Sequence, residues 1–132
     1  MTDYVIDASA LLLALIGKTS DADELRARLP ETRRHAPHLI DAEVGSVLRR
    51  HEQAGRISGD EAETALRAAG RLVDHRYPHT GALAERAWGL RRNVTFYDGL
   101  YVALAAHLGI PLLTVDTRLS RAPGLPCRTE LV

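Results

Sequence analysis

Two short, near-continuous apolar segments, each followed by an aspartate, limit this chain to few folds. Residues 4–6 precede Asp7, and residues 112–115 precede Asp116. Apolar runs of this length are typical of strands that are buried on both faces of a parallel sheet. Because the carboxyl ends of parallel strands lie at the same edge of a sheet, we expect the two carboxylates to meet in a crevice at that edge.

Segments with helical spacing of apolar residues alternate with the predicted strands. Helices are predicted over residues 10–16, 21–29, 38–54, 59–71, 81–92, 100–108 and 117–121, and strands over residues 4–6, 33–36, 72–77, 111–115 and 127–131. This alternation predicts an α/β fold, a three-layer α/β/α sandwich around a mostly parallel central sheet. A chain of 132 residues has room for one domain, which we expect to cover residues 1–132.

Several side chains of these helices have an expected place. The spacing of Ser58 and Glu61 predicts a capping box, in which each side chain binds a free backbone amide of the other residue. Thr80 is expected to cap the helix over residues 81–92. Apolar residues at helical spacing are expected to face the core, among them Leu66, Trp88 and Tyr101.

Composition excludes some classes of protein. Seventeen basic and seventeen acidic residues give a formal net charge of zero, so no overall field attracts nucleic acid or an anionic membrane. The single cysteine, Cys127, cannot form an intrachain disulfide and suits a reducing compartment. The longest apolar run, residues 8–16, is shorter than the roughly 20 residues of a membrane helix. We therefore expect a cytoplasmic protein that does not enter a membrane.

Two further acids are expected at the same crevice. Asp98 lies at the start of the predicted helix 100–108, where the helix dipole stabilises an anion, although a simple N-cap explains it equally well. Glu43 falls inside the apolar arc of helix 38–54, so its carboxylate is partly desolvated and requires a cation or a hydrogen-bond donor. Asp41 falls just outside that arc and is interpreted as a solvated or capping acid.

A cluster of Asp7, Glu43, Asp98 and Asp116 favours bound cations. Two carboxylates about 4 Å apart repel each other by about 4 kcal/mol at an effective dielectric constant of 20. Oxygen ligands suit Mg²⁺ or Mn²⁺, whereas the six scattered histidines have no zinc-like spacing and are interpreted as surface residues. Divalent ions in such a site activate a water and stabilise the leaving oxygen of a phosphodiester. We therefore expect metal-dependent phosphodiester hydrolysis.

Four segments together resemble the PIN-domain nucleases, and within them the VapC-type ribonuclease toxins of toxin–antitoxin pairs. The segments are residues 5–10 (VIDASA), 42–44 (AEV), 97–105 (YDGLYVALA) and 113–119 (LTVDTRL). Their order and spacing match over essentially the whole chain. The resemblance implies a metal-dependent endoribonuclease that hydrolyses RNA through a metal-activated water, with Asp7, Glu43, Asp98 and Asp116 as its catalytic and metal-binding acids.

The same resemblance implies partners and supporting residues. Members of the family usually form homodimers, and a small antitoxin covers the acidic groove; the helix faces of residues 8–16 and 38–54 are the candidate partner surfaces. Ser9 matches a small hydroxyl that would orient the site, and Thr117 would hold a metal-bound water, although Thr117 is more readily explained as a helix cap. Many relatives have an asparagine soon after the helix glutamate, whereas this chain has Gly45-Ser46 there.

Arginines around the groove are candidates for contacts with RNA phosphates. They are Arg49, Arg50, Arg92 and Arg118, with Arg91 and Arg121 as neighbours, and a solvated helix face explains them equally well.

Two alternative functions are consistent with the same residues. One is a catalytically inactive PIN-like module that binds RNA or protein. The other is a phosphatase of the haloacid dehalogenase type with Asp7 as its nucleophile. The second requires an aspartate two residues later as acid and base, and this chain has Ser9 there.

Overall fold

All five strands of the computed structural model, which describes residues 1–132, run parallel in a single sheet. Their order is β3-β2-β1-β4-β5, with bounds β1 Thr2–Ile6, β2 Thr32–Pro37, β3 His75–Tyr77, β4 Leu112–Thr114 and β5 Thr129–Leu131. After β1 the chain adds β2 and β3 on one side of it, and then adds β4 and β5 on the other side. The strand order therefore reverses between β1 and β4, and ligands of open α/β sheets bind outside such a switch point.

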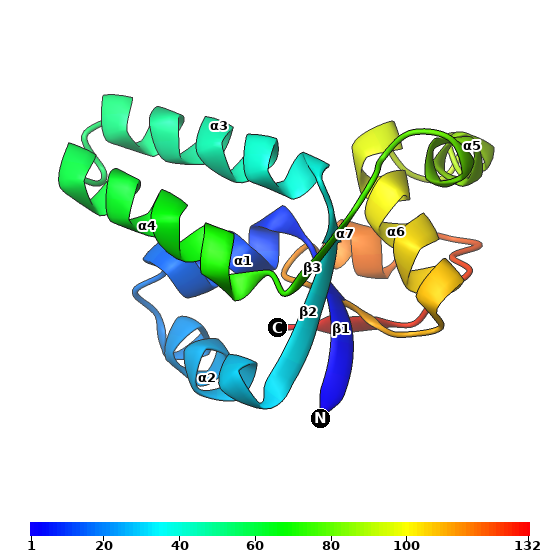
Figure 1. Ribbon diagram of the computed structural model, residues 1–132, viewed down its shortest axis with the longest axis horizontal. Coiled ribbons are helices and arrows are strands. Elements are labelled where there is room, and N and C mark those ends of the chain that lie inside the picture. Colours follow the sequence, from blue (N-terminus) through cyan, green and yellow to red (C-terminus); the bar gives the residue numbers. More distant parts are fainter.

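Helices cover both faces of this sheet. Helices α1 to α4 lie on one side and α5 and α6 on the other (Figure 1), which confirms the predicted three-layer sandwich. The helices are α1 Ala8–Ile16, α2 Ser20–Arg28, α3 Leu39–Gln53, α4 Gly59–Leu72, α5 Ala82–Gly89, α6 Phe96–Leu108 and α7 Thr117–Ser120, with a short 3-10 helix η1 at Leu29–Glu31. No helix is both long and apolar enough to cross a membrane.

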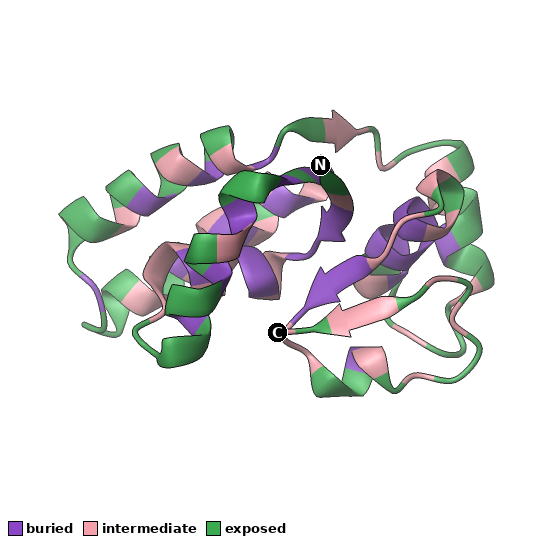
Figure 2. Cartoon of the chain, turned by 90° about the horizontal axis from the view of Figure 1, so that it is seen from below, coloured by how far each residue is buried: buried purple, intermediate pink, exposed green.

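Buried residues are concentrated on β1, β4 and α6 (Figure 2), and α1 and α3 bury further residues on the opposite face of the sheet. Every residue of α6 from Gly99 to Ala105 is buried, including Tyr101 as predicted. Gly99 allows α5 to approach closely, because a Cβ there would lie 3.2 Å from the carbonyl oxygen of Ala87. The start of α6 therefore lies close against α5.

Two residues expected in the core lie on the surface instead. Leu66 is 48% exposed and Trp88 is 59% exposed. Helix α4 buries its alanine face through Ala65 and Ala69, and Leu66 lies off that face. Helix α5 buries Ala87, and the Trp88 ring stacks outside against the guanidinium of Arg91, whose Cζ lies 4.7 Å from the ring centroid. Both helices bury a narrow alanine face and leave a large neighbouring side chain exposed.

Helix ends follow the expected capping chemistry at one site and not at another. The capping box of Ser58 and Glu61 is present at the start of α4. Thr80, by contrast, does not cap α5, because the N-cap is Gly81 with a φ of 63° and no side chain completes the cap. The strand predicted over residues 72–77 is confirmed only over His75–Tyr77, since α4 continues to Leu72.

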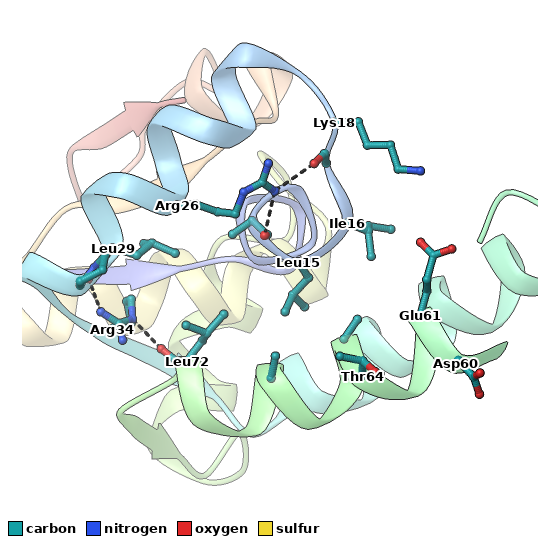
Figure 3. A pocket seen from close by; sticks show the side chains of 15 residues that line it. Leu15, Ile16, Lys18, Arg26, Leu29, Arg34, Asp60, Glu61, Thr64 and Leu72 are labelled. Atoms are coloured by element: carbon teal, nitrogen blue, oxygen red, sulfur yellow. Dashed lines mark hydrogen bonds between the residues drawn. The ribbon is translucent and has the colours of Figure 1, made fainter. Parts of the chain in front are cut away.

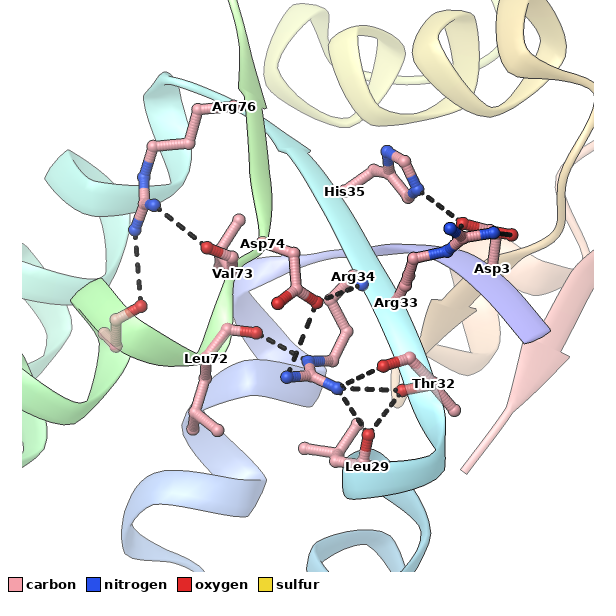
Figure 4. A network of polar contacts seen from close by, with 11 residues as sticks. Asp3, Leu29, Thr32, Arg33, Arg34, His35, Leu72, Val73, Asp74 and Arg76 are labelled. Carbon is pink, nitrogen blue, oxygen red and sulfur yellow. Dashed lines mark hydrogen bonds and ion pairs between the residues drawn. The ribbon is translucent and has the colours of Figure 1, made fainter. Parts of the chain in front are cut away.

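Polar side chains join neighbouring strands to one another and to the end of α4 (Figure 4). Asp41, interpreted as a solvated or capping acid, lies in the first turn of α3 with its side chain 45% exposed. It also accepts two hydrogen bonds from Arg76 at 2.7 and 2.9 Å, which join α3 to β3 and were not predicted. His35 is half-buried rather than on the surface. Its Nε2 lies 2.9 Å from Asp3 Oδ1 and its Nδ1 lies 2.7 Å from the Tyr77 hydroxyl. Paired partners across neighbouring strands are not visible in a linear sequence.

Arg34 is the most buried arginine of this network. Its guanidinium donates to the carbonyl oxygens of Leu29, Thr32 and Leu72, the last two at 2.6 and 2.5 Å, and it faces the Asp74 carboxylate at 3.5 Å. These partners belong to η1, to β2 and to the end of α4 with the segment that follows it. One side chain therefore holds three separate segments together (Figure 4).

Replacement of Arg34 by methionine should destabilise the fold. The Arg34 side chain is 9% exposed, and its loss leaves carbonyl groups of three segments without their donor, which costs about 2–4 kcal/mol. The Asp74 carboxylate keeps the hydrogen bond of 2.8 Å from the backbone amide of residue 34. Arg33 on the same strand is 54% exposed, so Arg33→Met should cost less than about 1 kcal/mol. Urea unfolding of both variants measures this difference, and equal losses would contradict the role of Arg34.

Candidate active site

Asp7 is the most buried carboxylate of the site. It lies directly after β1, caps helix α1 and is 5% exposed. Its Oδ1 accepts hydrogen bonds from the Ser9 hydroxyl at 2.6 Å and from the Ala10 amide at 2.9 Å, and its Oδ2 accepts one from the Thr114 hydroxyl at 2.5 Å. Burial raises the pKa of Asp7, these three donors oppose the shift, and the nearby charge of Asp98 adds to it.

Two hydroxyl groups connect the end of β1 to the end of β4. The Ser9 hydroxyl accepts a hydrogen bond from the Val115 amide at 3.2 Å, and the Thr114 hydroxyl accepts one from the Asp116 amide at 3.0 Å. The hydrogen bond expected of Ser9 is present. Thr114 was not expected in the site, although a fully buried hydroxyl at the end of an apolar strand could have indicated it.

Asp116 lies two residues after β4 and caps α7. Its Oδ1 accepts hydrogen bonds from the amides of Arg118 and Leu119 at 2.9 and 3.2 Å, and no protein donor reaches its Oδ2. Thr117 is exposed and begins α7, so the interpretation of Thr117 as the helix cap is wrong: Asp116 caps instead. The expected role of Thr117 near a metal stays a prediction.

Glu43 reaches the same edge of the sheet from α3. Its Oε1 accepts a hydrogen bond of 2.6 Å from the hydroxyl of Tyr101, a buried residue of α6. Burial raises the pKa of Glu43, the Tyr101 hydrogen bond opposes this, and the charges of Asp98 and Asp7 raise it further. The pKa of Tyr101 is also raised by burial and by the neighbouring carboxylates, so its hydroxyl stays protonated and acts as a donor.

Asp98 is the third residue of α6 and is partly buried. The N-cap is Thr95, whose hydroxyl accepts from the Asp98 amide at 3.2 Å, so the interpretation of Asp98 as a simple N-cap is wrong. Burial raises the pKa of Asp98; the Thr95 side chain opposes this, the charge of Asp116 adds to it, and the charge of Arg118 lowers it. Asp98 therefore interacts electrostatically with each of the other three acids.

The four acids form a cluster that the protein does not neutralise, since none of them forms an ion pair with an arginine, lysine or histidine. The atoms that these four side chains offer to a cation are all carboxylate oxygens, which suit Mg²⁺ or Mn²⁺. No three acidic, histidine or cysteine side chains are grouped closely enough to hold a metal ion between them. Mg²⁺ is commonly held by one or two carboxylates and several waters, so the donor set fits such an ion without a full protein cage.

Two of the four candidate arginines are close to the acids. Arg118 acts on the pKa of Asp98, and Arg50 lines the same cavity as Glu43 while donating to the Ser46 hydroxyl at 3.2 Å. Arg49 and Arg92 are exposed and make no hydrogen bond or ion pair within the protein, so the structure does not connect them to the site. Ser46, in the region where the resemblance leads us to expect an asparagine, therefore accepts a hydrogen bond from Arg50 instead.

Cavity size alone does not identify this site. A cavity of about 980 Å³ lies between α1, α2 and α4 and includes none of the four acids (Figure 3). Arg26 closes one part of it by donating to the carbonyl oxygens of Ala14 and Gly17 at 3.1 and 2.9 Å. A smaller cavity of about 420 Å³ is bordered by Ser9 and Glu43 and opens beside the acids.

The chain is similar to known proteins over nearly its whole length. The sequence profile of the PIN domain matches residues 4–125. Ribonuclease VapC1 of Mycobacterium tuberculosis is 54% identical over 132 residues, which cover 100% of this chain and 99% of that protein.

Two solved structures share the fold. VapBC2 of Rickettsia felis, bound to a DNA fragment from its promoter, has a TM-score of 0.72 at 11% identity and covers 99% of both chains. VapC20 of Mycobacterium tuberculosis, described as a toxin that cleaves the sarcin-ricin loop, has a TM-score of 0.67 at 22% identity and covers 90% of this chain and 93% of that one.

Removal of the Glu43 charge should stabilise the metal-free protein at neutral pH. A carboxyl group with a raised folded pKa costs stability as the pH rises through that pKa, and costs nothing below the unfolded pKa of 4.5. Glu43→Gln keeps an acceptor for Tyr101, so we expect a gain of about 0.5–2 kcal/mol near pH 7 that disappears below about pH 4.

Urea unfolding in the presence of a chelator at both pH values measures this gain. Glu63→Gln is the matched control, because Glu63 is an exposed acid of α4 and its pair with Arg67 is on the surface. That control should change stability by less than about 1 kcal/mol. Destabilisation by Glu43→Gln at neutral pH would contradict the electrostatic description of the cluster.

Proposed function

Because the chain belongs to the PIN-domain family and, within it, to the VapC proteins, we propose that it is a divalent-metal-dependent endoribonuclease acting as the toxin of a toxin–antitoxin pair. The observation that carries this proposal is the set of four carboxylates at the switch point between β1 and β4. They come from four different segments, three of them have raised pKa values, and no protein cation pairs with them. Clustered acids of this kind are typical of functional sites rather than of structural ones.

Asp7, Glu43, Asp98 and Asp116 would hold Mg²⁺ or Mn²⁺ in this proposal, with one or two of the carboxylates in direct contact with the ion and waters between the ion and the others. Such an ion, when bound, supplies an activated water and stabilises the charge that develops on the phosphate. Other side chains of the protein hold these carboxylates in place. Ser9 and Thr114 fix both oxygens of Asp7, and Tyr101 fixes one oxygen of Glu43. Asp116 keeps one oxygen free of protein donors.

Arg50 and Arg118 are the arginines that we propose as contacts for RNA phosphates. Both are exposed, and both lie next to acids of the cluster. An anionic substrate must approach four carboxylates, so cations at the rim offset that repulsion and orient the phosphate. Arg49 and Arg92 have no comparable support and stay predictions.

Two observations weigh against the alternative functions. A phosphatase of that type requires an aspartate two residues after Asp7 as acid and base, whereas Ser9 stands there and its hydroxyl donates to Asp7 at 2.6 Å. An inactive binding module has no need of buried, mutually repelling carboxylates, which only cost stability in the absence of a cation.

We propose a small antitoxin as the protein partner. The support is the likeness to VapBC2 and to VapBC-5 of Mycobacterium tuberculosis, a member of the VapBC family of toxin–antitoxin systems. A groove of about 460 Å³ between α1 and α3 begins at Ser9, beside the acids, and is lined by Leu12, Leu13 and Val47. These helices include both predicted partner surfaces. A homodimer and a cytoplasmic place of action belong to the same proposal and rest on the family.

Replacement of Asp98 by asparagine should abolish most RNA cleavage. Asp98 is preferable to Asp7 for this test, because Asp7 also caps α1 and its loss would weaken the fold. With single-stranded RNA and Mn²⁺ or Mg²⁺, we expect Asp98→Asn to lower kcat by more than about 100-fold. Glu63→Gln, on the exposed face of α4, should cleave at the wild-type rate. Cleavage by Asp98→Asn at that rate would remove Asp98 from the site.

Divalent metal should stabilise the wild-type protein. A cation that binds only the folded state at a hundredfold excess over its Kd adds about 2.7 kcal/mol, which raises the Tm of a chain of this size by roughly 5–10 °C. We expect Mn²⁺ to do so in thermal melts, and Asp98→Asn to reduce the shift.

The Mn²⁺ effect should also depend on pH. Because the pKa values of Asp7, Glu43 and Asp98 are raised, protons compete with the ion, and the Mn²⁺ shift should shrink as the pH falls. A melting temperature that ignores Mn²⁺ at neutral pH would favour the inactive binding module.

A further inference from the structure

The cavity beside the acids has the dimensions and lining of a small-ligand site. Its volume is about 420 Å³, within the range of about 300–1,000 Å³ for such sites. It shares Ser9 and Glu43 with the acidic cluster, so whatever fills it lies next to the proposed site of cleavage. Leu12, Leu39 and Val47 give it apolar walls.

One rim of the cavity is an exposed aromatic ring. Tyr97 is the second residue of α6, next to Asp98, and is 59% exposed although the helix that follows is buried. Its ring stacks on no other aromatic ring or cation of the protein, and its hydroxyl makes no hydrogen bond. Trp88 is equally exposed at 59%, but its ring is covered by Arg91. Tyr97 therefore offers an uncovered aromatic face at the mouth of the cavity.

Hydrogen-bond donors line the cavity as well. The Arg50 guanidinium is held in place by its hydrogen bond to the Ser46 hydroxyl and uses only one of its five N–H groups in doing so. The remaining donors suit a phosphate or the edge of a base. An aromatic face, apolar walls and a free guanidinium together match the chemistry of a nucleotide.

We propose that this cavity binds one unpaired nucleobase of the RNA substrate, adjacent to the bond that is cut, with the base stacked on Tyr97 and Arg50 on the neighbouring phosphate. The proposal rests on the endoribonuclease function above and deepens it. Proteins recognise RNA bases mainly where they are unstacked and free to lie on aromatic side chains. A base held in a duplex cannot enter such a cavity, so the substrate is a single strand or a loop.

Tyr97 is accordingly a substrate-positioning residue rather than a source of chemistry. Stacking of a base on an aromatic side chain tolerates any base, because every base has a π-face. The cavity therefore selects for an unpaired nucleotide at a fixed distance from the acids, and it does not require a particular base. The cleavage position would be set by this distance.

Variants of Tyr97 test the proposal on a single-stranded RNA that the wild type cuts at one mapped bond. Tyr97→Ala should lower kcat/KM by about 5- to 150-fold, the range for loss of one base stack, whereas Tyr97→Phe keeps the ring and should be near wild type. Trp88→Ala is the matched control, since it removes an equally exposed ring that does not line the cavity. It should cleave like the wild type, and thermal melts should show that all three variants are folded.

A substrate lacking one base provides the decisive comparison. For the wild type, kcat/KM on RNA with an abasic ribose next to the cut should fall by the same factor that Tyr97→Ala causes on intact RNA. For Tyr97→Ala, removal of that base should cause no further fall in kcat/KM. Binding of the uncut RNA to the metal-free protein, followed by fluorescence anisotropy, should show the same pattern. Independent, additive losses would overturn the proposal, and so would wild-type cleavage by Tyr97→Ala or equal cleavage of duplex and single-stranded RNA.

Failure of the proposed function has a different signature. A wild-type protein that cuts no RNA with Mn²⁺ refutes the endoribonuclease function and this inference together. A wild type that cuts RNA while Tyr97→Ala cuts it equally well refutes only the base-binding cavity.

Discussion

The hydrogen bonds of the buried Asp7 carboxylate are the constraint on which the rest of the site depends. Three donors, from Ser9, Ala10 and Thr114, surround a carboxylate that has left water at the end of β1. These bonds start helix α1 and join the two central strands at the switch point. Without such donors the burial of a charge would cost several kcal/mol, so the local sequence has to provide them. The same bonds that permit the burial also fix the carboxylate in place.

The rest of the cluster shows how the fold tolerates repulsion. Glu43 and Asp98 are only partly buried, and each is placed by a helix that is anchored elsewhere in the core. Polar contacts far from the cluster, such as those of Arg34, hold the surrounding segments together. Stability is therefore concentrated in the strands and in α6, while the crevice itself carries unfavourable charge. Such a distribution is common where a site is built to bind a cation or a transition state.

Sequence reasoning predicted the layers of the fold because the apolar runs of β1 and β4 and the buried pattern of α6 report burial directly. It also brought Asp7 and Asp116 to one edge, since parallel strands leave little choice. It failed at Leu66 and Trp88, where α4 and α5 bury alanine and leave the large residue outside. It also missed Thr114 and the pair of Asp41 with Arg76, because such partners depend on which strands become neighbours. The metal ligands and the roles of Thr117, Arg49 and Arg92 stay predictions.

The hydrogen bond between Tyr101 and Glu43 joins helices of the two opposite layers of the sandwich. Helices α6 and α3 lie on different sides of the sheet (Figure 1), and the 2.6 Å bond spans the edge between them. Separation of the two layers at this edge breaks this bond and removes the one protein donor of the Glu43 carboxylate. One hydrogen bond beside the acids therefore limits how far α3 and α6 can move apart, and it couples the position of Glu43 to the buried helix on the opposite face of the sheet.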